Sequence, residues 1–358
     1  MHIHGGDIYT YQGMLDFSAN INPLGLPPAV VRAAAEGAAQ AAAYPDTQCR
    51  DLRQALAEAE GPGWLQPANI ICGNGAADLI FMLALASKPR RALLLAPSFH
   101  EYEQALRSVG CQIDYHYLKE AEGFRLYIDR LLAQMQAEKP DVLFICNPNN
   151  PTGLALPRPA LEPLAEHCRQ TNILLVLDEC FNEFLDEPQE YTLKPLLPDN
   201  PQLFILKAFT KLYAMPGLRL GFGLCTNAAL LTKMEACAQP WRVSTPAQLA
   251  GLAALREEAY VLQAQALIRQ ERAFLSAELA KLGLVVYGSM ANYIFFRAPQ
   301  APKLAEACRT QQPGVLIRDC SNYVGLEAGY FRVAVRTRPE NEQLLKALRQ
   351  ALPGGLTK

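Results

Sequence analysis

The sequence predicts an α/β protein in which a large domain, built on a mostly parallel sheet, is followed by a small α+β domain at the C-terminus. Its 358 residues suggest about two structural units, at roughly 150 residues per domain. Up to residue 282, short apolar runs alternate with segments of helical period, which is the pattern of a parallel sheet wrapped by helices. After Gly283, short strand-like runs alternate with only two helical segments.

The large domain takes its predicted sheet from five apolar runs of strand length. They are Ala92–Ala96, Val142–Cys146, Ile173–Leu177, Leu203–Lys207 and Gly221–Cys225. The clearest helical stretches between or after them are Glu101–Val109, Ala160–Thr171 and Leu230–Ala238. This spacing is typical of βαβ crossovers. Residues 246–282 contain no proline after Pro246 and predict one long helix, and the alanine-rich segment 33–43 predicts a helix that faces solvent.

The small domain is predicted from a change in the pattern of strand-like and helical segments. Four strand-like segments and two helical ones follow Gly283: strands at Leu284–Tyr287, Tyr293–Arg297, Gly314–Arg318 and Phe331–Val335, and helices near Ala301–Gln311 and Pro339–Leu352. We therefore expect three parts: an N-terminal arm and helix over residues 1–40 that packs with the small domain, a large domain over 41–282, and a small domain over 283–358.

The charge balance excludes some classes of partner. There are 33 basic and 35 acidic side chains, a net charge of −2, whereas a protein that binds nucleic acid usually has a basic surplus. No segment approaches ~20 uninterrupted apolar residues, so no membrane span is predicted. Residues 1–6 also lack the basic start and apolar run of a secretory signal. We expect a cytoplasmic protein.

Ten cysteines suggest neither a zinc site nor a disulfide framework. The closest pairs, such as Cys168 and Cys180, lie twelve positions apart, so no Cys-x-x-Cys motif exists and no metal site is predicted. Cys146 and Cys180 lie at the ends of apolar runs, where a free thiol behaves as a small hydrophobe.

Three segments carry residue types that could hold an anion or a charged ring. The turn Cys72–Asp78 contains Gly73 and Gly75 and leads into an apolar helix, so the free N–H groups of residues 75–77 could bind a phosphate, although such a turn can also be ordinary. The loop Asn147–Gly153 follows a predicted strand and directs Asn150 outward from the carboxyl edge of the sheet, where ligands bind; a plain Pro-Asn turn is the alternative. Asp178 ends an apolar strand, where a carboxylate requires a cationic partner.

A fourth segment, Phe209–Gly221, contains two cationic side chains, Lys211 and Arg219. Together the four segments fit one cofactor, pyridoxal 5′-phosphate, which needs a lysine amine for its aldehyde, a carboxylate for its ring nitrogen and donors for its phosphate. The lysine is Lys211 and the carboxylate is Asp178. The phosphate is assigned to Gly75, Ala76, Ala77, Thr210 and Arg219. Tyr102, after the strand Ala92–Ala96, is expected to cover the ring, with core packing as its alternative role.

With these motifs the chain resembles, over its whole length, the fold-type I or aspartate aminotransferase superfamily of pyridoxal-phosphate enzymes. The motifs are Asn150-Pro-Thr-Gly, Asp178-Glu, Thr210-Lys211 and Gly217-Leu-Arg219. Within that superfamily it is most similar to the threonine-phosphate decarboxylases of cobalamin biosynthesis, relatives of the histidinol-phosphate aminotransferases. That similarity rests on His4-Gly-Gly6, Leu15–Gly25, Tyr44-Pro-Asp46, Val315–Tyr323 and Tyr330–Arg336.

The resemblance implies a fold-type I transferase fold and a set of substrate-binding residues. Arg332 would bind the substrate carboxylate, near Asn20, while His4, Asn20 and Arg318 would surround a substrate phosphate. Tyr44 would reach this site from the second subunit of a homodimer. Arginine suits both anions, since its planar fork matches carboxylate and phosphate. Arg336 or Arg338 could replace either arginine.

The implied reaction is decarboxylation of L-threonine O-3-phosphate to (R)-1-amino-2-propanol O-2-phosphate. Aminotransferases usually have Tyr three residues after the Asp that binds the ring nitrogen, whereas this chain has Phe181, as the decarboxylases tend to have. Asn150 would then be the main partner of the cofactor's 3′-oxygen. A histidinol-phosphate-type aminotransferase and a serine-phosphate decarboxylase are the rivals. A regulator on this fold would need a nucleic-acid-binding module, and the residues before Gly73 offer neither length nor basic charge for one.

Overall fold

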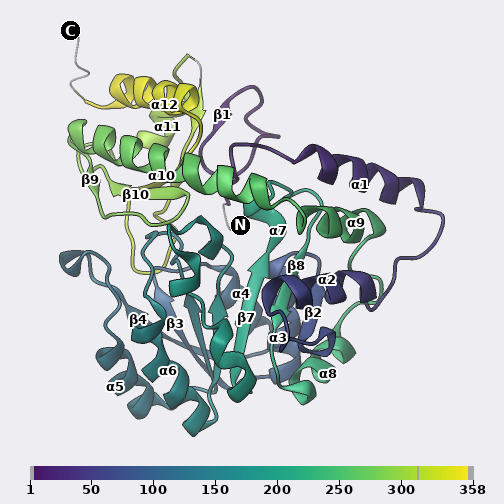
Figure 1. Cartoon of the computed structure of the whole chain (residues 1–358). Helices are drawn as coiled ribbons and strands as arrows, with labels where there is room; N and C mark the ends of the chain where they lie inside the picture. Colours follow the sequence, from purple (N-terminus) through teal and green to yellow (C-terminus); the bar gives the residue numbers. More distant parts are fainter. Residues whose placement is uncertain (1–3, 313, 354–358) are drawn as a thin grey trace.

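The computed structural model describes residues 4–312 and 314–353 and confirms the α/β class. Its large part is built on a seven-stranded sheet with the order β2-β8-β7-β6-β5-β3-β4, in which only β8 runs antiparallel to its neighbours (Figure 1). The strands are β2 (Ile70–Gly73), β3 (Arg91–Ala96), β4 (Gln112–Tyr117), β5 (Val142–Cys146), β6 (Leu174–Asp178), β7 (Leu203–Ala208) and β8 (Gly221–Leu224). The five predicted strands lie within one residue of these bounds, whereas β2 and β4 were not predicted.

Helices cover both faces of this sheet, because the inner strands bury alternate residues on opposite sides. Leu143 and Ile145 of β5 pack on one face and Val142 and Phe144 on the other. The first face is covered by α2 (Arg50–Glu60), α5 (Ile128–Glu138), α6 (Arg158–Thr171) and α9 (Thr245–Ala254). The second face is covered by α3 (Ala76–Ser87), α4 (Glu101–Ser108) and α8 (Ala228–Cys237). Short 3₁₀ turns connect elements at η1 (Pro67–Asn69), η2 (Glu120–Glu122), η3 (Asn182–Phe184), η4 (Pro188–Glu190) and η5 (Lys194–Asp199).

The long helix predicted over residues 246–282 is two helices, α9 and α10 (Glu258–Lys281). The two pack on different partners: α9 lies along α1 (Pro28–Ala39), while α10 runs to the small part (Figure 1). Tertiary packing therefore overrides the helical composition between them. The N-terminal helix α1 thus packs on α9, while the arm before it pairs with the small part through β1 (Leu15–Asp16). Gly37 allows the close approach of α1 and α9, since a Cβ there would lie 2.6 Å from Cα of Pro246.

The small part contains an antiparallel sheet in the order β12-β13-β10-β9, covered by α11 (Leu304–Arg309) and α12 (Arg338–Ala351). Its strands are β9 (Val285–Val286), β10 (Tyr293–Arg297), β12 (Arg318–Asp319) and β13 (Tyr330–Ala334). The predicted strand at 314–318 is divided, because its first half, β11 (Val315–Leu316), instead pairs in parallel with β1 (Leu15–Asp16) of the N-terminal arm. Ile268, Leu275 and Leu279 of α10 belong to the same core, so a boundary at Gly283 would cut through it.

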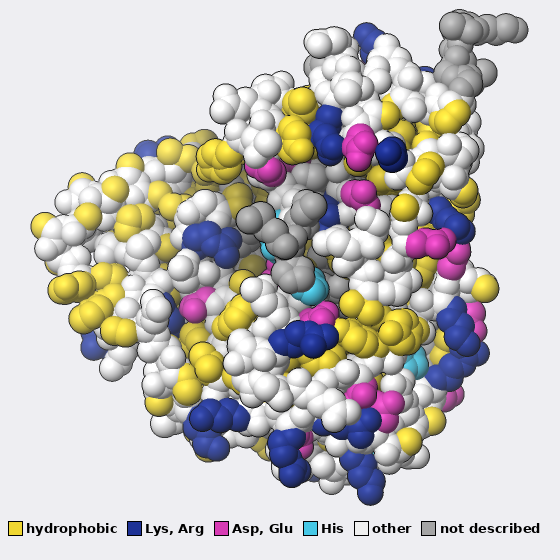
Figure 2. Space-filling view, turned by 180° about the vertical axis from the view of Figure 1, so that it is seen from behind, with side chains coloured by type: hydrophobic (Ala, Val, Ile, Leu, Met, Phe, Trp, Pro, Cys, Tyr) yellow, Lys and Arg dark blue, Asp and Glu magenta, His cyan; other side chains and the backbone are white. Residues whose placement is uncertain are grey.

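Charge is mixed over the surface seen in Figure 2, where Lys and Arg side chains lie among acidic ones. Among the described residues, no helix combines the length and the apolar character needed to cross a membrane.

Candidate active site

A cavity of about 330 Å³ lies at the carboxyl ends of the central strands, and residues of the N-terminal arm and of the small part complete its wall. This is where ligands bind in open α/β sheets. Most of the predicted site residues line it: His4, Asn20, Ala76, Ala77, Asn150, Asp178, Thr210, Lys211, Arg219, Arg318 and Arg332. Gly75, Tyr102 and Tyr44 are not on its wall.

One end of the cavity is built to hold an anion. Gly75 is the N-cap of α3, with φ +84°, so the N–H groups of Ala76 and Ala77 begin the helix at the cavity wall. The Arg219 guanidinium lies against Gly75, where a Cβ would come within 2.5 Å of Nη2. Glycine is therefore needed at position 75 both for its φ and for this contact. Thr210 completes this end, which fits the phosphate site expected from the sequence.

Lys211 follows β7 on the short helix α7 (Phe209–Leu212) and directs its amine into the cavity. Burial, aided by the nearby charge of Arg332, lowers the pKa of Lys211 to about 8. A lysine amine with this pKa is partly unprotonated near neutral pH, as a nucleophilic or proton-transferring lysine requires.

Asp178 ends β6 and is almost fully buried. It accepts hydrogen bonds from the Tyr102 hydroxyl and from the Cys180 N–H, the latter at 3.0 Å. Burial raises the pKa of Asp178 above its ordinary value, although Cys180 and Tyr102 oppose this effect. A cationic ring nitrogen in the cavity would be the partner that the sequence predicts for this carboxylate.

Tyr102 is buried and packs in the core, the alternative role that the sequence left open, and its covering of the cofactor ring stays a prediction. Its ring stacks on Phe144 beneath the cavity, at 4.9 Å between centroids, and its hydroxyl donates to Asp178. Phe99 is on the wall instead, together with His100 and Glu101. Tyr102, the second residue of α4, is buried against the sheet, whereas Phe99, before the helix, is partly buried.

Arg332 lies on the opposite wall and is 6% exposed. Its Nη1 donates to Oδ1 of Asn150 and its Nη2 donates to the Ser18 carbonyl at 2.8 Å. Oδ1 of Asn150 also accepts from Tyr323 at 3.3 Å, which leaves the Asn150 amide nitrogen as the donor for a ligand. Arg336 and Arg338, the alternatives to Arg332, are ion-paired with glutamates elsewhere, at 2.6 and 3.0 Å, and neither is on the wall.

Arg318 is the second arginine of the wall. It is 7% exposed, and its Nη2 donates to Oδ1 of Asn322 at 2.7 Å. His4 lines the same region, with Nδ1 at 3.1 Å from Oε1 of Glu101.

Three buried atoms of wall residues have no hydrogen-bond partner within residues 4–312 and 314–353. They are Asn20 Oδ1, Glu101 Oε2 and Arg332 Nε. Buried polar groups are normally paired, so their clustering here fits a cavity that binds a polar ligand.

Tyr44 lies away from this cavity and is 78% exposed, stacked on Trp241 with 4.3 Å between ring centroids. Its role in the site of a second subunit stays a prediction.

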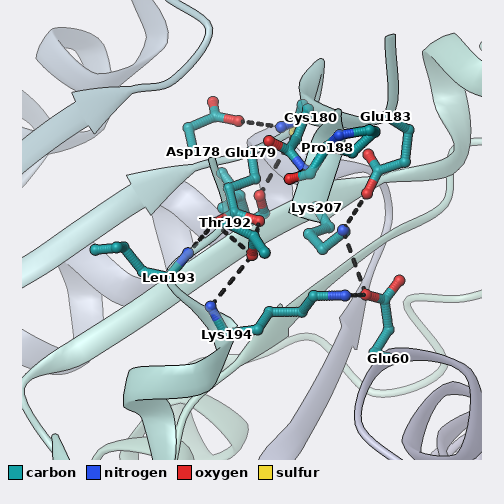
Figure 3. A network of polar contacts seen from close by, with 12 residues as sticks. Glu60, Asp178, Glu179, Cys180, Glu183, Pro188, Thr192, Leu193, Lys194 and Lys207 are labelled. Atoms are coloured by element: carbon teal, nitrogen blue, oxygen red, sulfur yellow. Dashed lines mark hydrogen bonds and ion pairs between the residues drawn. The ribbon is translucent and has the colours of Figure 1, made fainter. Parts of the chain in front are cut away.

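A buried ion network adjoins the site behind Asp178 (Figure 3). Lys207 contacts Glu183 and lies 3.3 Å from Glu60, which also pairs with Lys194 at 2.8 Å. Burial acts to raise the pKa of Glu60, but Lys207 and Lys194 outweigh it and lower the pKa to about 2. Sequence reasoning missed this network, because its members come from segments far apart in the chain.

Comparison with known proteins gives a consistent picture. The family model for class I and II aminotransferases matches residues 12–348. The chain is 41% identical to the threonine-phosphate decarboxylase of Salmonella typhimurium, over 98% of this chain and 97% of that protein. It is 32% identical to the histidinol-phosphate aminotransferase of Symbiobacterium thermophilum, over 96% and 91% of the two chains. The crystal structure of the histidinol-phosphate aminotransferase from Clostridium acetobutylicum superposes with a TM-score of 0.86 at 28% identity, covering 94% and 98%.

Proposed function

This chain belongs to the class I and II aminotransferase family, and we propose that it is a pyridoxal 5′-phosphate-dependent decarboxylase of L-threonine O-3-phosphate. The products would be carbon dioxide and (R)-1-amino-2-propanol O-2-phosphate, in cobalamin biosynthesis. The observation that carries the proposal is the pair of buried arginines, Arg318 and Arg332, on the wall of the cavity that also holds Lys211 and Asp178. Two fixed guanidinium groups suit a substrate with both a carboxylate and a phosphate.

The residues of the cavity fit the cofactor. The N–H groups at the start of α3, with Thr210 and Arg219, would hold its phosphate, Asp178 would keep its ring nitrogen protonated, and Lys211 would bind its aldehyde carbon. When bound, the cofactor supplies an electron-accepting ring that takes up the electron pair released at Cα of the substrate. Lys211 is then placed to hold or deliver a proton near that carbon.

The substrate would be fixed at both ends by this chain's side chains. Arg332 would bind its carboxylate, with Asn20 close by, while Arg318, His4 and Asn20 would bind its phosphate. Two anchors restrict rotation of the substrate, and the rotation determines which bond at Cα is broken. Phe181, on the same wall, cannot donate the hydroxyl hydrogen bond of the tyrosine that aminotransferases usually have there.

The rival functions are a histidinol-phosphate-type aminotransferase and a serine-phosphate decarboxylase. Identity of 41% to a decarboxylase against 32% to an aminotransferase supports the proposal over the first. We would incubate the holoenzyme with threonine phosphate, with serine phosphate, and with histidinol phosphate plus 2-oxoglutarate, measuring carbon dioxide and glutamate. We expect carbon dioxide from threonine phosphate. Glutamate formation without carbon dioxide would refute the proposal.

We also propose that the active form is a cytoplasmic homodimer whose sites are shared through Tyr44. Exposed apolar side chains on and near α1 support this, with Leu26 42%, Val31 50% and Trp241 44% exposed. Many hydrophobic side chains lie on the lobe at the left of Figure 2. Mixing inactive Lys211→Ala subunits with inactive Tyr44→Ala subunits should restore activity, since one site of each mixed dimer would be whole. No restored activity, with subunit exchange demonstrated, would contradict a shared site.

A further inference from the structure

We propose that Glu101 is a positioning residue for the substrate phosphate: it holds the His4 imidazole by Nδ1, so that Nε2 faces the phosphate in the cavity. The inference rests on the proposed function, because it concerns how that site distinguishes a phosphorylated amino acid from an unphosphorylated one.

The two residues of the pair differ in how firmly they are held. Glu101 is the first residue of α4, and its side chain is 12% exposed. His4 belongs to the N-terminal arm, and its side chain is 57% exposed. Nδ1 of His4 lies 3.1 Å from Oε1 of Glu101. Ordering an exposed side chain costs conformational entropy, so a carboxylate fixed on a helix can pre-order the imidazole before the substrate arrives.

The backbone of the arm is fixed near His4 as well. The Gly6 N–H donates to the Ser18 hydroxyl at 2.8 Å, and a Cβ on Gly5 would lie 2.2 Å from the Ser18 carbonyl oxygen. That carbonyl accepts from Arg332. With the backbone fixed, the orientation of the His4 imidazole depends on its side-chain contact with Glu101.

The charges around Glu101 explain how a carboxylate is tolerated beside a phosphate site. Burial raises the pKa of Glu101, while the charges of His4, Lys211 and Arg318 oppose this effect. The carboxylate therefore lies among cations that offset its repulsion of an anionic substrate. Its second oxygen, Oε2, is buried without a hydrogen-bond partner in the described chain, so Glu101 is not committed to another contact.

Glu103, two residues further along the same helix, provides a matched control. It is also 12% exposed, it accepts a hydrogen bond from Arg107 at 2.7 Å, and its Oε2 lies 3.5 Å from Nδ1 of His100, although Glu103 itself is not on the cavity wall. Glu103→Gln removes the same charge from α4, keeps an acceptor oxygen for His100 and leaves the contact between Glu101 and His4.

The test titrates holoenzyme with L-threonine phosphate and, separately, with L-threonine, following the absorbance of the cofactor. Loss of one hydrogen bond to a charged group predicts that Glu101→Ala weakens binding of L-threonine phosphate by about tenfold, with binding of L-threonine unchanged. Glu101→Gln keeps an acceptor oxygen and should remain within roughly threefold of the wild type. Glu103→Gln should bind both compounds as the wild type does. The Glu101→Ala/His4→Ala double variant should bind no more weakly than His4→Ala, because both changes remove one contact.

Several outcomes would overturn the inference: equal losses for both compounds, additive losses in the double variant, or tighter binding of the phosphoester by Glu101→Ala. Because the readout is binding, the two proposals fail separately. A wild type that does not prefer the phosphoester would refute the proposed substrate, whereas a preference that persists in Glu101→Ala would refute the role of Glu101 alone. The cofactor absorbance and the melting temperature report whether each variant is folded.

Discussion

Lys207 and Lys211 lie four residues apart, yet in the cofactor-free protein their pKa values should be shifted in opposite directions. Burial and the charge of Arg332 lower the pKa of Lys211 to about 8 from an ordinary value near 10.5. This lowering of the pKa by about 2.5 makes protonation of Lys211 roughly 3.4 kcal/mol less favourable than that of an ordinary lysine. At pH 7.5, roughly a quarter of Lys211 side chains would carry a free amine, against about one in a thousand for an ordinary lysine. For Lys207, burial lowers the pKa, but Glu183 and Glu60 outweigh it and raise the pKa above its ordinary value.

Competitive acetylation with trace acetic anhydride, analysed by mass spectrometry across pH, would measure both lysines in one experiment. Lys233, exposed on α8, serves as the reference. Lys211 should show a midpoint near pH 8, while Lys207 should remain unreactive over the accessible range. Arg332→Ala should raise the midpoint of Lys211, and Arg336→Ala, which alters an arginine outside the cavity, should not.

The reasoning would be refuted if Lys211 reacted with a midpoint at or above 10, or if Lys207 reacted as readily as Lys211. The first result would mean that the cavity does not desolvate the amine. The second would mean that the ion network does not hold Lys207 in its charged form.

Three further predictions concern the carboxylates and the network. Asp178→Asn should retain the cofactor, seen by absorbance, but lower kcat at least about hundredfold, because an uncharged partner no longer stabilises a protonated ring nitrogen. Lys207→Met should lower the free energy of unfolding, measured in urea, by up to ~3–5 kcal/mol, since Glu183 loses its cation and Glu60 keeps only Lys194, and Lys207→Met/Glu60→Gln should lower it less. Burial raises the folded-state pKa of Glu179 to about 7 from 4.5, so protonation of Glu179 stabilises the folded state. This contribution to the free energy of unfolding is lost as pH rises from about 4.5 to 7. Between pH 5 and pH 8, the free energy of unfolding measured in urea should therefore fall less for Glu179→Gln than for the wild type, by up to roughly 3 kcal/mol. Parallel curves of unfolding free energy against pH for the two proteins would contradict this assignment.

The sequence predicted the parts of the cavity that depend on strand ends. Asp178 and Lys211 each follow an apolar run, and the carboxyl ends of parallel strands meet at one edge of a sheet, so their proximity could be predicted from the chain alone. Glu101 could not be identified in this way, because its proposed role depends on a contact with His4, 97 positions earlier in the chain. Glu60 and Lys207 are separated by 147 positions, and no local pattern connects them.

The pair Asp178 and Glu179 shows why a local pattern stops short of function. Successive side chains at a strand leave on opposite faces, so adjacent carboxylates are expected to enter different environments. Asp178 lies on the face of α4, bonded to Tyr102, and reaches the cavity. Glu179 lies on the other face and accepts from the Thr192 hydroxyl at 2.8 Å and the Leu193 N–H at 2.9 Å. Burial raises the pKa of both, but only Asp178 opens onto a space that a cationic ring could fill. The alternation predicts that the two carboxylates separate, and the segments packed on each face determine which of them can take part in chemistry.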